Sequence, residues 1–227
     1  SNGQQIDIQK SRFVLDKNII NKARQLAVLY RVTLNEIFLL VWGALLQYIS
    51  RRNDVVFGMI ISGRPPELDD VERMAGLFTN THPLRMHETL SANLGEGIGN
   101  LHGWLSTAQT KVHCPVDQVC RQLEIYYEDI LFIFENYPDV SNFMDCKEKP
   151  AFQVRDYQVY SPIACPFALV VEPEKQTIEV NFDRNRYPQE EIQKIGYQYL
   201  NALTKAVENP EDTLMEYFEP SNFREGC

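Results

Sequence analysis

Four histidines are the side chains best suited to proton transfer near neutral pH, and no two of them are adjacent: His82, His87, His102 and His113. His113 precedes Asp117 by the His-x-x-x-Asp spacing, which can pair a general base with a carboxylate. Pro115 lies between them and predicts the start of a helix, so we expect a structural or capping role for His113. For His82, which has no carboxylate nearby in the sequence, packing is the favoured interpretation.

The chain contains five cysteines, an odd number without Cys-x-x-Cys spacing: Cys114, Cys120, Cys146, Cys165 and Cys227. This pattern argues against a disulfide framework and against a zinc site. Cys114 follows His113, but neighbours in sequence rarely meet as nucleophile and base. We therefore expect buried, unreactive thiols in a reduced, cytoplasmic protein that holds no metal.

One hydroxyl and one amide are candidates for binding a polar intermediate. The apolar run Ile60-Ile61 ends in Ser62-Gly63, which predicts that Ser62 lies where a buried strand leaves its sheet. A hydroxyl at this place can donate a hydrogen bond to an oxyanion, while Gly63 allows close backbone approach and Asn80 offers an amide. The alternative is that Ser62 caps a turn and Asn80 satisfies a loop carbonyl.

The composition is that of one folded domain that does not bind nucleic acid. The 227 residues are 44% hydrophobic and 23% charged, which excludes a disordered or low-complexity chain. The net charge of −9 repels phosphate backbones. The longest apolar stretch, from Ile37 to Leu46, is shorter than the roughly 20 residues that span a bilayer. We expect a tag remnant at residues 1–3, one domain over 4–220 and a tail over 221–227.

Apolar periodicity predicts three main helices over residues 18–30, 33–50 and 188–208. The second begins at Thr33, where Thr33 and Glu36 have capping-box spacing, and it is apolar on every side, so it must be central. Pro188 is expected to open the last helix. Less regular patterns predict two further helices, over 91–111 and 116–126.

Runs of β-branched and aromatic residues predict the strands. We expect them over 4–15, 54–61, 77–86, 130–135, 151–160, 166–172 and 176–182. The third is expected to end at Pro83 or soon after it, and Glu174-Lys175 to join the last two as a hairpin. The interpretation is an α/β fold with a mixed sheet packed against helices.

Several ordered segments together resemble the C-terminal half of a nonribosomal peptide synthetase condensation domain, over roughly residues 12 to 208. They are Val32-Thr33-Leu34-Asn35, Asp54-Val55-Val56-Phe57-Gly58, Ser62-Gly63-Arg64-Pro65, Met74-Ala75-Gly76-Leu77-Phe78-Thr79-Asn80-Thr81, Pro83-Leu84-Arg85 and Phe134-Glu135-Asn136-Tyr137-Pro138. The resemblance marks as motif or structural residues Arg64, Gly76, Phe78, Thr79, Thr81, Arg85, Glu135 and Asn136.

The resemblance implies a chloramphenicol acetyltransferase-like fold. Two lobes form a V, and the tunnel between them receives phosphopantetheine arms from two carrier proteins. An acceptor amine attacks a donor thioester there and forms an amide. The catalytic His-His-x-x-x-Asp-Gly signature belongs to the first lobe, and this chain has no adjacent histidine pair. The resemblance thus implies no catalytic residue in this chain and no activity for the lobe alone.

Two later motifs of the family depart from its pattern here. Of its His-Gln-Asp-x-Pro-Phe motif only His113 and Pro115 remain, and residues 121–131 stand where Arg-Asp-x-Ser-Arg-Asn-Pro-Leu is expected. The alternatives are a divergent or starter-type member, an epimerisation-like relative, another carrier- or CoA-dependent acyltransferase of the superfamily (polyketide-associated, with a hydroxyl acceptor), or a non-catalytic scaffolding domain.

The implied partners are carrier proteins, the N-terminal lobe and a neighbouring adenylation domain of a bacterial synthetase that makes antibiotics or other secondary metabolites. No membrane, nucleic acid or directly bound cofactor is expected. A lobe without its partner exposes the apolar strip that faced it, which predicts self-association.

Overall fold

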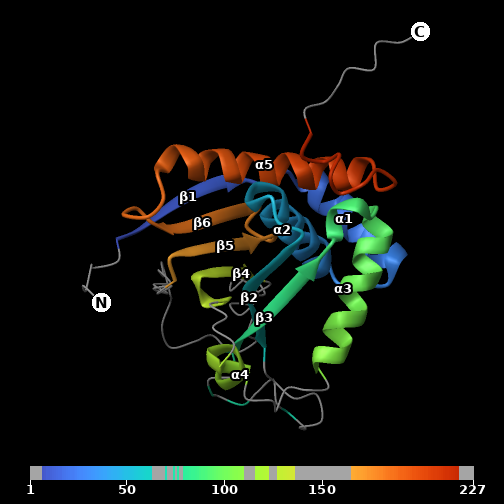
Figure 1. The fold of residues 1–227 in the computed structure, drawn as a ribbon. Coiled ribbons are helices and arrows are strands. Elements are labelled where there is room, and N and C mark those ends of the chain that lie inside the picture. Colours follow the sequence, from blue (N-terminus) through green and yellow to red (C-terminus); the bar gives the residue numbers. More distant parts are fainter. Residues whose placement is uncertain are drawn as a thin grey trace, which may run out of the picture.

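A six-stranded mixed sheet forms the centre of the computed structural model (Figure 1), in which residues 7–62, 70, 74, 76, 79–109, 116–122, 127–135 and 165–219 are described. The strands are β1 (Ile8–Val14), β2 (Asp54–Ser62), β3 (Thr79–His87), β4 (Ile130–Phe134), β5 (Phe167–Glu172) and β6 (Thr177–Asp183). Their order in the sheet is β1-β6-β5-β4-β2-β3. Strands β2, β4 and β5 are parallel, and the other pairs are antiparallel. The predicted α/β fold with a mixed sheet is confirmed.

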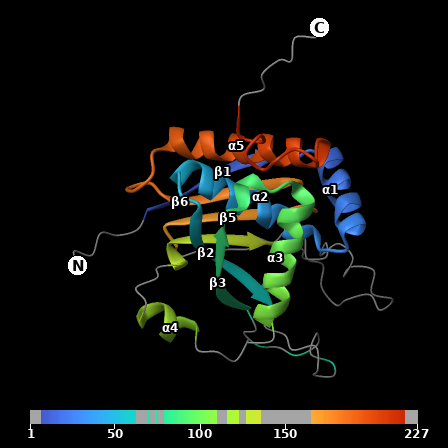
Figure 2. The ribbon, with the colours of Figure 1, turned by 45° about the vertical axis from the view of Figure 1, so that its right-hand side comes forward.

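The three main helices are also confirmed, to within a residue or so at each end. They are α1 (Lys17–Tyr30), α2 (Leu34–Ser50) and α5 (Gln189–Glu208). The other α-helices in the described residues are α3 (Leu94–Gln109) and the short α4 (Val116–Gln122). Helix α2 contacts α1, α3 and α5. Figures 1 and 2 show α5 lying along the β1 end of the sheet and α3 beside β3. Single 3-10 turns precede α3 (Thr89–Ser91) and β4 (Tyr127–Asp129).

Helix α2 is central, as its apolar sequence predicts. The capping box is present, because the Thr33 side chain accepts a hydrogen bond from the Glu36 N–H while Glu36 accepts one from the Thr33 N–H. Every residue from Glu36 to Gln47 is buried. Trp42 stacks on Phe167 of β5 and meets Tyr199 of α5 edge-on. The helix therefore joins the sheet to the outer helices in one apolar core.

No single helix in the described ranges is long and apolar enough to cross a membrane. Helices α1 and α2 reach the length and hydropathy of a membrane span only when they are taken together, and they are bent by 104° relative to one another.

Two element ends differ from the sequence prediction for identifiable reasons. Strand β3 continues through Pro83 to His87, because β3 is an edge strand, where a residue without an N–H is tolerated. Helix α5 begins one residue later than expected, since Pro188 is its N-cap, with φ −62° and ψ 139°, and not its first helical residue. The predicted strand over 151–160 lies outside the described residues.

The sheet has a second face, opposite the main helices. Along β5, Phe167, Leu169 and Val171 join the main core, while Ala168 belongs to a smaller apolar cluster with Leu131. That cluster also contains Cys165, with Ile60 and Ile133 packed against it. Side chains alternate along a strand. The residues two and four positions after Leu131 and Ala168 therefore extend this second face towards the ends of β4 and β5.

Candidate functional site

The parallel strands β2, β4 and β5 all end at the same side of the sheet, which we call the carboxyl end. They end at Ser62, Phe134 and Glu172, and the antiparallel β3 starts there at Thr79. Strands β2 and β4 pair at only two positions, Gly58 with Leu131 and Met59 with Phe132, well before their ends. Open α/β sheets bind ligands outside the carboxyl ends of their strands. This end is the candidate site.

Ser62 occupies the predicted position, as the last residue of β2. Its partner across the antiparallel pair is Thr79, and Asn80 is opposite Ile61. Thr79, which the sequence analysis treated only as a motif residue, is therefore the direct cross-strand neighbour of Ser62. Thr79 is identified by the strand register. The register depends on how β2 and β3 pair, and sequence spacing does not reveal it.

Asn80 is exposed and is engaged locally. Its Oδ1 accepts a hydrogen bond from the Thr81 N–H at 2.9 Å, and its Nδ2 lies 3.4 Å from Nε2 of His82. His82 is partly buried on the same strand. The amide oxygen thus accepts a hydrogen bond from a backbone N–H, which differs from the alternative in which Asn80 satisfies a loop carbonyl. Both residues lie at the carboxyl end.

Arg85 lies at the opposite end of the β2–β3 pair and is not brought to Ser62. Its guanidinium donates hydrogen bonds to the Asp54 carboxylate, from Nε to Oδ1 at 2.9 Å and from Nη2 to Oδ2 at 2.7 Å. These hydrogen bonds lower the pKa of the Asp54 carboxyl. Gly76 is exposed and Thr81 is partly buried. Gly63, Arg64, Phe78 and Asn136 lie outside the described residues.

Glu135 does reach the carboxyl end, directly after β4. Its N–H donates to the Val171 carbonyl at 2.9 Å, which extends the β4–β5 pairing and sets Glu135 beside Glu172. Burial raises the pKa of Glu135, and the charge of Glu172 and a hydrogen bond to it raise it further. The carboxyl end therefore combines Ser62 and Thr79, on the β2–β3 pair, with Glu135 and Glu172, at the end of the β4–β5 pair.

One histidine has a carboxylate partner that the sequence did not indicate. Nδ1 of His102 on α3 lies 2.7 Å from Oε1 of Glu36, the buried carboxylate of the α2 capping box. The pair joins α2 and α3. His113 lies outside the described residues, and those described include no His, Cys, Asp or Glu group suited to a metal ion.

The two cysteines within the described ranges are buried free thiols, as expected. Sγ of Cys165 donates to the Phe167 carbonyl at 2.9 Å, and burial raises the pKa of this thiol to about 11. A thiol with this pKa stays protonated near neutral pH and is a poor nucleophile.

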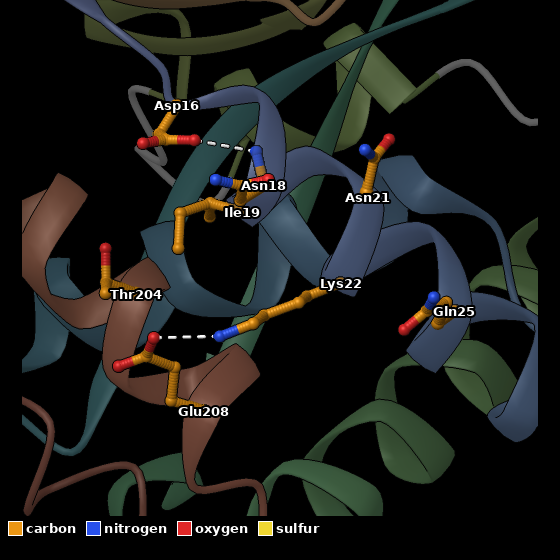
Figure 3. A pocket seen from close by; sticks show the side chains of 8 residues that line it. All are labelled: Asp16, Asn18, Ile19, Asn21, Lys22, Gln25, Thr204 and Glu208. Atoms are coloured by element: carbon orange, nitrogen blue, oxygen red, sulfur yellow. Dashed lines mark hydrogen bonds and ion pairs between the residues drawn. The ribbon is translucent and has the colours of Figure 1, made fainter.

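A groove of about 690 Å³ lies between α1 and α5, away from the carboxyl end. Figure 3 shows Lys22 of α1 reaching across it to Glu208 of α5, with nitrogen and oxygen 2.9 Å apart. Its lining also includes the α1 N-cap Asp16 and Thr204 of α5. It contains none of the predicted site residues, and we do not assign it a role.

Comparison with known proteins agrees with the geometry. Residues 1–225 match the condensation domain family. Gramicidin S synthase 2 of Brevibacillus brevis is 32% identical over 205 residues, which cover 88% of this chain and 5% of that protein. Tyrocidine synthase 2 of Brevibacillus parabrevis is 27% identical over 204 residues, which cover 87% of this chain and 6% of that protein.

Solved structures share the fold at low sequence identity. The condensation domain of the Monacolin K polyketide synthase has a TM-score of 0.74 and 15% identity, over 94% of this chain and 51% of that one. A four-domain nonribosomal peptide synthetase bound to AMP and glycine has a TM-score of 0.79 and 16% identity, over 96% of this chain and 18% of that one. The chain thus spans a small part of the curated relatives and about half of a solved condensation domain. It belongs to the condensation domain family of nonribosomal peptide synthetases, and it has the chloramphenicol acetyltransferase-like α/β fold of half such a domain.

Proposed function

We propose that this chain is the C-terminal lobe of a condensation domain and forms one wall of the tunnel in which a synthetase joins carrier-tethered substrates through an amide bond. The observation that carries the proposal is the carboxyl end of β2, where Ser62 pairs with Thr79 in a chain that matches the family over residues 1–225. The order of the family motifs, which begins after the expected place of the His-His-x-x-x-Asp-Gly signature, supports the assignment to the second lobe.

The partners follow from this assignment. Carrier proteins present their substrates on phosphopantetheine arms, which enter the tunnel as tethers and not as a cofactor held by this lobe. The N-terminal lobe supplies the histidine that orients or deprotonates the amine. One structural relative is a four-domain synthetase, which supports adenylation and carrier domains as neighbours in the parent protein.

Ser62 is proposed to act on the tetrahedral intermediate. The acceptor nitrogen attacks the thioester carbon, and negative charge develops on the carbonyl oxygen until the carbon–sulfur bond breaks and the thiol leaves with a proton. A hydroxyl at the end of a buried strand can donate a hydrogen bond to that oxygen without adding charge. Such a donor is worth roughly 2.7–4 kcal/mol in acyl-transfer sites.

The test uses the full-length parent synthetase. Ser62→Ala should lower the rate of amide formation by roughly 10²–10³, with unchanged thermal stability and carrier affinity. Ser106→Ala, at an exposed position of α3, is the matched control and should leave the rate unchanged. A normal rate for Ser62→Ala together with a lower melting temperature would show that the hydroxyl is structural.

The 227-residue chain alone, mixed with loaded carrier proteins, should form no amide, because the lobe that bears the histidine is missing. Turnover by this chain would overturn its assignment as the C-terminal lobe.

A further inference from the structure

Glu135 and Glu172 face each other at the carboxyl end of the two central strands. The parallel register pairs Phe134 with Val171, and the residue that follows each of them in the chain is a glutamate. The Glu135 N–H donates to the Val171 carbonyl, so the two backbones remain paired at this point. The sheet thus places the two glutamates at neighbouring positions of adjacent chain segments, on the same face.

The charged groups around this pair leave Glu135 facing acids. Glu172 binds Nζ of Lys175, in the turn after β5, and accepts a hydrogen bond at 3.1 Å from Thr177 Oγ1, at the start of β6. On β6, Glu179 is paired with Lys10 and Arg12 of β1, each at 2.8 Å. Lys175 favours an ionised Glu135, whereas Glu172 and Glu179 oppose it. These three cations are held by the other two glutamates.

Two carboxyl groups can hydrogen-bond to each other only when one of them carries a proton. A half-buried glutamate beside a fixed carboxylate binds that proton more readily than an exposed one. The pKa of Glu135 is raised accordingly.

We propose that Glu135 and Glu172 form a proton-sharing pair that ties the carboxyl ends of β4 and β5 together in mildly acidic solution and loosens them when the proton is lost. This inference depends only on the fold and holds whether or not the proposed function is correct. It makes the carboxyl end of the sheet sensitive to pH.

The direction of the pH effect follows from linkage. Because the folded chain holds the proton more tightly than the unfolded chain, the stabilisation is complete below the ordinary pKa of glutamate. It is lost as the pH rises through the raised pKa of the folded state. Above that pH the two carboxylates repel each other.

The experiment compares the 227-residue chain with its Glu135→Gln variant, by thermal unfolding from about pH 4.5 to about pH 8. Glutamine is neutral, and its amide can donate to Glu172 at every pH. The variant should therefore melt about 2–4 °C higher than the wild type at the alkaline end. The difference should shrink towards zero at the acid end, where the wild type gains its proton. Glu128→Gln, at an exposed position, should show no such trend.

A second measurement needs no variant. The side-chain carboxyl carbon of Glu135 in a ¹³C-labelled chain should titrate above about pH 4.3, the ordinary glutamate value. A Glu135→Gln effect that is the same at every pH, or a Glu135 carboxyl that titrates at the ordinary glutamate value, would show that the pair shares no proton and would overturn the proposal.

Discussion

At the scale of single residues, Glu179 is the counterpart of Glu135 on the second face of the sheet. Although burial raises its pKa, the hydrogen bonds and charges of Lys10 and Arg12 lower it more, so that the pKa of this carboxyl lies below that of an ordinary glutamate. Its side chain is only 9% exposed, while its two partners reach solvent. The same face of the sheet thus holds two glutamates, on either side of β5, whose pKa values are displaced in opposite directions.

Glu179→Gln should therefore destabilise the fold by about 1 kcal/mol, the scale of a well-placed ion pair with exposed cations. Because the folded pKa is depressed, the loss should be complete above about pH 4.3, the ordinary glutamate value, and should fade as the pH falls through the folded pKa. Urea unfolding across this range measures it. A loss that grows towards alkaline pH, or is undiminished in acid, would contradict the ion-pair account.

Sequence reasoning located these residues only in part. The run of strand-forming residues over 176–182 predicts β6 (Thr177–Asp183) correctly, because residue type is a local property. It does not identify Lys10 and Arg12 as the partners of Glu179, since they lie on a strand at the other end of the chain. In the same way, the spacing pointed to Ser62 but not to Thr79. Strand register is decided by packing, which no local pattern records.

At the scale of elements, the helices were predicted more accurately than the sheet. The capping box at Thr33 and the apolar run after it determine α2 from neighbouring residues alone. The order of the strands places β1, the first along the chain, beside β6, the last, and that contact follows only from the complete fold. The third strand was predicted over 77–86, with an end at Pro83 or soon after it, and β3 reaches His87, because a proline is tolerated on an edge strand.

Two helical glycines differ in how closely other side chains pack against them. A Cβ at Gly196 of α5 would lie 2.1 Å from Cζ of Phe13, which is buried on β1, whereas a Cβ at Gly103 of α3 would meet nothing within 4 Å. Gly196→Ala should thus destabilise the fold by about 1–3 kcal/mol through overpacking. Gly103→Ala should stabilise it by about 0.5–1 kcal/mol, because alanine favours the helix.

Urea denaturation midpoints of the two variants, each against the wild type, provide the measurement. The same substitution in both helices serves as its own control for helix propensity. Equal effects at Gly196 and Gly103 would show that Phe13 does not pack against α5 as described.

At the scale of the whole molecule, the family could be identified from the sequence because its motifs occur in a fixed order over most of the chain. The site could not be completed in the same way, since the chain spans about half of a solved condensation domain. Among the described residues, large apolar side chains exposed to solvent occur on β1, α1, α3 and α5, for example Val14 at 81%, Val28 at 79% and Leu29 at 70%. None of these is needed to build the core of this lobe.

The isolated chain is therefore expected to self-associate. Burying exposed apolar surface favours association, whereas the net charge of −9 opposes it through repulsion between copies. Salt screens this repulsion over about 10 Å at 0.1 M, so association should increase with both protein and salt concentration.

Sedimentation velocity over a concentration series at low and high salt measures both trends. The condensation domain with both lobes is the control and should associate less if, as proposed, its other lobe packs against this one. A clean monomer at high protein and salt concentration would contradict the prediction, as would equal association by the complete domain.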